Sequence, residues 1–307
     1  IRADKEFPYL KQYKELPEPQ ERKAIFKNVG ALSLHKLATV IVRSTDNLIM
    51  SAFDGLATVG IYSNYKLVLM NVNNLLGHVT GAFTASIGNL NALEGRKRVY
   101  EIFRILDFAA FLLYGYLSGG LVTLINFFIR MIFGEEYLFS MTVVVIIMAE
   151  FFISGLRQMG LQFREALGLF WHDRYKALAE AIINLVVSLI LVRRFGVAGI
   201  IGATGLARLF TIFWYEPKVL FHRTFGRSAA AYFKAQGGLL LLNGAVMALS
   251  LLLCARMGHT LMWIILKGIT CAAVTALLYT LALGRTAEYR WMLEKGRSFL
   301  RKWRKKA

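Results

Sequence analysis

Long hydrophobic stretches alternate with short polar segments along nearly all of the chain after residue 28. A helix needs about 20 mainly apolar residues to cross the ~30 Å hydrocarbon core of a bilayer. The pattern therefore predicts an all-α integral membrane bundle of about eight transmembrane helices. Because Pro217 lies at the end of a stretch, we expect each helix to run unbroken. The predicted spans are 29–53, 58–88, 103–129, 139–163, 175–193, 197–216, 232–254 and 260–283.

Polar residues recur at helical spacing within the first predicted span. Lys36, Arg43, Asp46 and Asn47 fall within about 100° of arc at 100° per residue. A charge in the hydrocarbon region is costly, so ionisable side chains there face protein or a water-filled cavity. Arg43 and Asp46 are three residues apart, which leaves two interpretations open: an internal ion pair, or the lining of a cavity.

Further polar faces occur in the second and fourth spans. The second span aligns Asn64, Asn71 and Asn74, and the fourth aligns Glu150 with Arg157. Glu150 has no basic residue one turn before it, so we expect it to be the least compensated acid. The third, seventh and eighth spans carry few such residues and are expected at the lipid-facing periphery. The candidate substrate cavity therefore comprises Lys36, Arg43, Asp46, Asn47, Asn64, Asn71, Asn74, Glu150, Arg157 and Arg208.

The fifth and sixth spans are joined by a short turn and should be antiparallel neighbours. Glu180 and Arg208 both lie about 17–20 Å from that turn at 1.5 Å per residue. One interpretation is a salt bridge between the two helices. The other is a site for a monovalent cation such as Na⁺, built from oxygens of Asp46, Glu180, Asn184 and Thr204, because hard cations prefer oxygen ligands. No other metal site is expected, and neither is a cofactor.

The net charge of +18 is arranged by topology rather than for a nucleic-acid partner. Of the 37 Lys and Arg residues, 27 fall in alternate connecting segments or the two ends, four in the other connections, and six within spans. By the positive-inside rule, both ends of this chain are expected in the cytoplasm. Residues 1–28 then form a cytoplasmic linker and residues 286–307 a basic cytoplasmic tail.

Two neighbouring strings resemble a known family. Residues 44–49 (STDNLI) and 55–65 (GLATVGIYSNY) are similar to the seventh and eighth helices of Wzx-type bacterial polysaccharide flippases. These belong to the superfamily that includes the multidrug (MATE) exporters and the lipid II flippases. Supporting strings are 133–138 (FGEEYL), 180–185 (EAIINL) and 195–200 (FGVAGI). The resemblance covers roughly residues 25–225, and the last two spans only by position.

The resemblance implies a membrane transporter of the bacterial cytoplasmic membrane. Members look like two six-helix lobes around a central cavity, often with two extra helices. This chain would supply the second lobe (29–225) and the extra pair (226–285), so we expect it to be a fragment that works with an amino-terminal lobe. The implied substrate is a lipid-linked oligosaccharide of the undecaprenyl diphosphate type, moved between leaflets by alternating access.

The resemblance also implies roles for individual residues. Cations such as Lys36, Arg43 and Arg208 would bind the diphosphate. Coupling to Na⁺ or H⁺ would use Asp46, Glu180 or Asn184, together with Thr204 of the oxygen-ligand site.

Two other functions compete with the flippase interpretation. A multidrug exporter of the same superfamily would need a net acidic cavity for organic cations, whereas this one is mixed or basic. A membrane sugar polymerase or ligase usually carries catalytic residues on a large outer loop. The outer connections here are short and lack paired carboxylates, nucleophile–base pairs or metal spacings. We therefore expect a transporter and not an enzyme.

Overall fold

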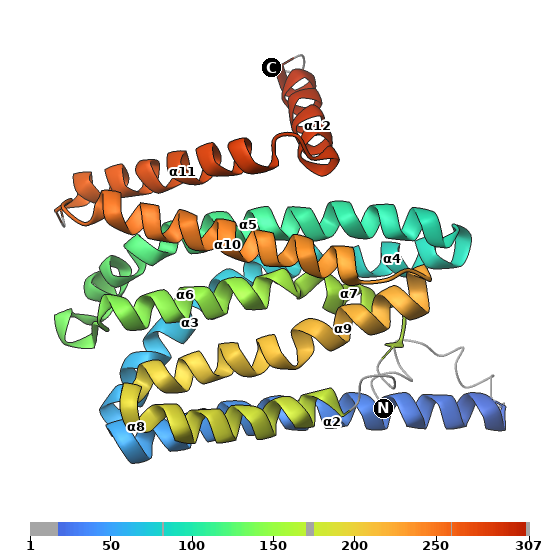
Figure 1. The fold of residues 1–307 in the computed structure, drawn as a ribbon, viewed down its shortest axis with the longest axis horizontal. Helices are drawn as coiled ribbons and strands as arrows, with labels where there is room; N and C mark the ends of the chain where they lie inside the picture. Colours follow the sequence, from blue (N-terminus) through green and yellow to red (C-terminus); the bar gives the residue numbers. More distant parts are fainter. Residues whose placement is uncertain (1–17, 82, 170–174, 259, 305–307) are drawn as a thin grey trace, which may run out of the picture.

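The long helices of the computed structural model run roughly along one common axis (Figure 1). The structure describes residues 18–81, 83–169, 175–258 and 260–304, and all regular secondary structure in these ranges is helical. The α-helices are α2 (Pro19–Asp54), α3 (Leu56–Gly81), α4 (Phe83–Leu93), α5 (Arg96–Phe133), α6 (Met141–Leu156), α7 (Gln158–Ala166), α8 (Lys176–Phe210), α9 (Ile212–Leu220), α10 (Ala230–Cys254), α11 (Leu261–Leu283) and α12 (Ala287–Arg304), with a 3-10 turn η2 (Glu135–Tyr137) and a π-helical turn η4 (Phe221–Phe225).

Six helical stretches in the described residues are long and apolar enough to cross a membrane. This finding supports the expected multi-pass membrane bundle. The predicted second span is not among the six stretches found in the described residues; these residues belong to α3 before position 82 and to α4 after it. The six stretches are Pro19–Asp54, Arg96–Phe133, Met141–Ala166, Lys176–Phe225, Ala230–Cys254 and Leu261–Leu283.

Helix α8 contains nearly all of the predicted fifth span and most of the sixth, folded back on each other at Gly196. The backbone of Gly196 has φ 53° and ψ −137°, a left-handed conformation that suits glycine. Side-chain contacts join residue 184 to 204 and residue 180 to 208, which is the constant-sum pairing of antiparallel helices. The two arms lie side by side in Figure 1. The prediction that these spans are antiparallel neighbours is confirmed.

The prediction of unbroken helices is wrong at two spans. The predicted fourth span divides at Arg157, between α6 and α7, and the sixth divides at Thr211, between α8 and α9. Thr211 Oγ1 donates to the Ala207 carbonyl at 2.6 Å, a bond back into the preceding turn that tends to bend helices. Pro217 lies inside α9 rather than after it. Its ring nitrogen cannot donate to the preceding turn, which weakens the helix beyond the break.

Helix α5 occupies the centre of the bundle, so the expectation that the third span is peripheral is wrong. It packs against α6 and against both α10 and α11. Two glycines permit the close approach: a Cβ at Gly115 would lie 1.9 Å from Tyr279 Oη, and one at Gly119 would lie 2.9 Å from Val246 Cγ1. These two glycines therefore let α5 pack closely against α10 and α11. Helices α10 and α11 do keep outward apolar side chains, such as Leu241.

The connections between helices gather at the two ends of the bundle (Figure 1). The turns after α2 and α10, the η2 segment and the Gly196 turn lie at one end, and the turns after α4 and η4 lie at the other. Helix α12 begins at the end of α11, partway along the long axis. The four basic residues assigned to outer connections, Arg130, Arg193, Arg194 and Arg256, belong to the first end. The alternation of basic and non-basic connections in the sequence thus makes one end of the molecule poor in basic residues and the other side rich in them.

Candidate functional site

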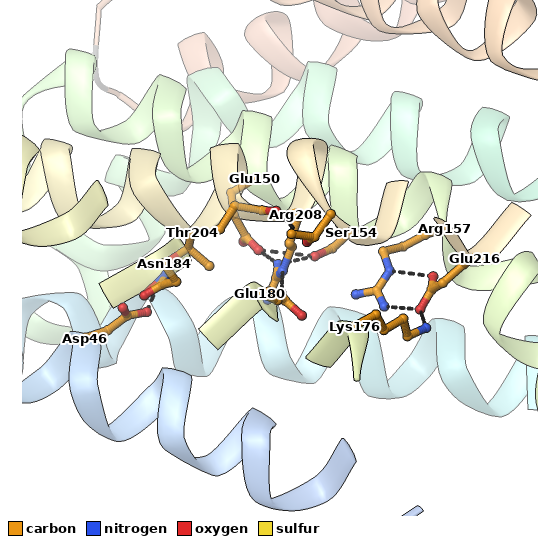
Figure 2. Close-up of polar contacts among 12 residues, drawn as sticks. Asp46, Glu150, Ser154, Arg157, Lys176, Glu180, Asn184, Thr204, Arg208 and Glu216 are labelled. Carbon is orange, nitrogen blue, oxygen red and sulfur yellow. Dashed lines mark hydrogen bonds and ion pairs between the residues drawn. The ribbon is translucent and has the colours of Figure 1, made fainter. Parts of the chain in front are cut away.

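Polar side chains form a row along the interior of the bundle, between α2, α6, α8 and α9 (Figure 2). Helix α8 packs on α2 with one side and on α6 with another, so its polar face is held between them. We call this set the polar row. Its members, in three adjoining groups, are Asp46, Asn184 and Thr204; Glu150, Ser154, Glu180 and Arg208; and Arg157, Arg164, Lys176 and Glu216.

The first group joins α2 to both arms of α8. The Thr204 hydroxyl donates to Asp46 Oδ2 at 3.0 Å and accepts from Asn184 Nδ2 at 2.9 Å. All three residues are buried, and among the residues that the structure describes, Asp46 Oδ1 and Asn184 Oδ1 have no hydrogen-bond partner. A buried acceptor without a donor is costly. The group therefore offers unsatisfied oxygens that suit a proton or a small hard cation.

The second group centres on Arg208, on the returning arm of α8. Its guanidinium pairs with Glu150 of α6, lies 3.4 Å from Glu180 Oε1, and donates to Ser154 Oγ at 2.5 Å. The predicted bridge between Glu180 and Arg208 is confirmed. The prediction that Glu150 is the least compensated acid is wrong, because its counterion comes from another helix. The side chains of Arg208, Glu150 and Glu180 are each partly exposed, by 16% to 22%.

The third group surrounds Glu216 of α9 with three cations. Arg157 makes two bonds to its carboxylate, at 2.8 and 3.2 Å, Arg164 lies at 3.5 Å, and Lys176 is in direct contact. Only 3% of the Glu216 side chain is exposed. Glu216 was not among the residues predicted from the sequence, and Arg164 and Lys176 had been assigned to a connecting segment. The useful signal was Arg157, a base within an apolar span.

The structure brings together part of the predicted cavity. Asp46, Glu150, Arg157 and Arg208 all belong to the polar row. Asn64 is half-buried, and the side chain of Arg43 lies outside the described residues, so its predicted pairing with Asp46 is not tested. Among the four predicted cation ligands, Glu180 is engaged by Arg208 and the other three are in mutual contact. The remaining candidates are exposed on α2 and α3: Lys36, Asn47, Asn71 and Asn74.

A second polar network lies on α5, α10 and α11, where few polar residues were expected. Gln236 Nε2 donates to Asp107 Oδ2 at 2.8 Å. Asn243 donates to Ser118 Oγ at 2.9 Å and accepts from Tyr279 Oη at 2.8 Å. Asp107 and Gln236 also line a pocket of about 620 Å³ beside α12. This network was not predicted from the sequence, because each of the three helices contributes only one or two polar residues to it.

No family model, curated protein or solved structure matches this chain. Within the described ranges, no group of three or more His, Cys, Asp or Glu side chains is placed to hold a metal ion. The function is therefore argued from the polar row and from the sequence resemblance.

Proposed function

We propose that this chain is the carboxy-terminal lobe of a Wzx-type flippase, with two added helices. It would move a lipid-linked oligosaccharide, typically linked through undecaprenyl diphosphate, from the cytoplasmic to the outer leaflet by alternating access. The protein would lie in the bacterial cytoplasmic membrane with about eight spans in this chain and both of its ends in the cytoplasm. The observation that carries the proposal is the polar row, because it places paired charges along the inside of a bundle of membrane-length helices.

The charge balance of the polar row supports a transport role. It contains four acids, Asp46, Glu150, Glu180 and Glu216, and four bases, Arg157, Arg164, Lys176 and Arg208. Charged residues within membrane spans are rare, and they commonly mark pathways for substrates or ions. In a protein with only a structural role, apolar packing would give the same or greater stability, because burying an ion pair costs desolvation free energy.

Arg208 is the residue we assign to the diphosphate. It is half-buried rather than sealed, and a guanidinium binds phosphate oxygens in a two-pronged arrangement. Because Glu150 and Glu180 already contact it, a diphosphate at Arg208 would compete with these carboxylates for the N–H groups of the guanidinium. A carboxylate displaced in this way would be free to bind a cation. This exchange links the arrival of an anionic substrate to the uptake of a cation.

The first group of the polar row is the second place where a coupling ion can bind. Asp46 Oδ1 and Asn184 Oδ1 lack donors, and Thr204 supplies a hydroxyl oxygen beside them. These oxygens fit Na⁺ or H⁺. Asp46 lies on α2 and Asn184 on α8, so a bound ion would bridge two helices.

The exposed polar residues indicate where an amino-terminal lobe would pack. Lys36 and Asn47 on α2, and Asn71 and Asn74 on α3, are exposed in this chain. Exposure to hydrocarbon would be costly for them. We therefore place the other lobe against α2 and α3, where these side chains would face the central cavity. An organic-cation exporter remains the competing function, and substrate tests separate the two.

Complementation in cells tests the proposal. The natural protein that contains this chain is expressed in a bacterium lacking its own flippase, and surface polysaccharide is measured with the level of protein in the membrane. We expect wild type to restore export, and Arg208→Gln and Asp46→Asn to lose it at normal membrane levels. Leu241→Ala is the control, because Leu241 is exposed on α10 and belongs neither to the polar row nor to α2 and α3. Failure of wild type, or export by both variants, would contradict the proposal.

A further inference from the structure

Helix α12 runs in a different direction from the rest of the bundle. Figure 1 shows it turning away from α11 and crossing the common axis of the long helices at a steep angle. Its first turns are fixed to the bundle: Glu288 pairs with Arg104, and Tyr289 Oη lies 2.7 Å from Thr280 Oγ1. The Tyr289 ring also meets Phe108 edge-on, with centroids 6.4 Å apart. The direction of α12 is therefore set by the folded protein.

The residues of α12 divide into an apolar face and a basic face. At 100° per residue, the apolar positions and Gly296 fall within about 120° of arc. Trp291 is the exception, and Lys295 Nζ lies 5.7 Å from its ring centroid. The apolar positions are Tyr289, Met292, Leu293, Phe299, Leu300 and Trp303.

The opposite face of α12 is strongly basic. The helix contains six Lys or Arg residues and two Glu residues. From Leu293 to Ser298 every residue is exposed, so this part of the helix projects beyond the bundle. It begins where α11 ends, away from the η2 and Gly196 turns and toward the side with most of the basic residues. An amphipathic helix with a basic polar face is typical of helices that lie in a membrane interface.

We propose that α12 lies in the plane of the membrane surface, with its apolar face inserted between headgroups and its basic face in contact with anionic phospholipids. If the long helices cross the bilayer, a helix that leaves the end of α11 at a steep angle to them runs along the surface. The charge of the helix selects the leaflet that carries anionic lipid, which is the cytoplasmic one. This contact would fix the depth of the bundle and hold α12 against the end of α5. It does not depend on which substrate the protein carries.

Two positions on the same turn provide a matched test. Gly296 lies at the centre of the apolar face, and a Cβ there meets nothing within 4 Å. Ser298 lies nearly opposite, and its hydroxyl bonds only to the Lys295 carbonyl of its own helix in the structure. Gly296→Cys and Ser298→Cys are each introduced into the whole chain with Cys254 and Cys271 changed to alanine. Each single cysteine is then spin-labelled, and the protein is placed in nanodiscs.

Accessibility to oxygen and to a water-soluble nickel reagent is compared between nanodiscs that contain phosphatidylglycerol and nanodiscs of phosphatidylcholine alone. With anionic lipid, we expect the label at 296 to be several-fold less accessible to nickel than the label at 298. The difference should shrink without anionic lipid, and also in a Lys295→Glu, Arg297→Glu variant. Equal nickel accessibility at both positions would overturn the proposal. A difference in nickel accessibility that stays the same without anionic lipid and in the Lys295→Glu, Arg297→Glu variant would also overturn it. Neither readout requires transport, so this test is separate from that of the proposed function.

Discussion

Replacing Glu216 by glutamine should destabilise the protein more than any exposed carboxylate change. Glu216 contacts Arg157, Arg164 and Lys176, and only 3% of its side chain is exposed. Glutamine keeps the shape but removes the negative charge, leaving three cations close together. The side chains of Lys176 and Arg164 are themselves only 4% and 9% exposed, so water screens them poorly. Breaking a buried pair by removing one partner typically costs about 3–5 kcal/mol, and we expect the upper half of that range.

Reversible unfolding in mixed detergent and SDS micelles measures the free energy of unfolding. Glu165→Gln is the matched control, since this carboxylate lies on the same helix as Arg164 but is exposed. We expect it to change stability by less than about 0.5 kcal/mol. Adding Lys176→Met to Glu216→Gln should recover part of the loss, because it removes one of the three cations that lie close together. A cost below about 1 kcal/mol for Glu216→Gln, or no recovery in the double variant, would refute the reasoning.

Two further predictions address packing and topology. Gly115→Ala should cost about 1–3 kcal/mol in the same unfolding assay, because the added Cβ collides with Tyr279, whereas Gly120→Ala on the same helix meets nothing within 4 Å and should be neutral or slightly stabilising. A stability loss shared equally by both variants would contradict the proposed contact. Arg194→Cys should react with an impermeant maleimide added outside intact cells, and Arg223→Cys only after permeabilisation, because basic connections stay in the cytoplasm. The reverse labelling pattern would show that the orientation is inverted.

The helical membrane bundle was predictable because its signals are local. Span length and helical spacing depend only on neighbouring residues, and the short turn near Gly196 fixes how the two arms of α8 pair. The contact between Glu180 and Arg208 followed from that register. The partner of Glu150 did not, because it depends on how α6 slides against α8, which no local pattern sets. Breaks within spans were missed for a related reason: Thr211 bends its helix through a single side-chain bond.

The central position of α5 was beyond the reach of sequence pattern. In a membrane, an apolar side chain is equally suited to lipid and to protein, so hydrophobicity does not separate inner helices from outer ones. Packing decides, through features such as Gly115 against Tyr279. Glu216 was missed because the residue beside Pro217 was taken as the end of a span. Its three cations come from two different parts of the chain, one of which had been taken for a connecting segment.

Direct measurement of lipid flipping tests the central claim that the polar row serves the movement of an anionic lipid-linked sugar. The natural protein containing this chain is reconstituted in proteoliposomes with a fluorescent undecaprenyl-diphosphate oligosaccharide, and the fraction reached by an external quencher is followed over time. The account predicts exchange between leaflets with wild type, a rate at least about tenfold lower with Arg208→Gln, and an unchanged rate with Leu241→Ala, which changes an exposed side chain of α10. No exchange with wild type, or an Arg208→Gln rate equal to wild type, would contradict it.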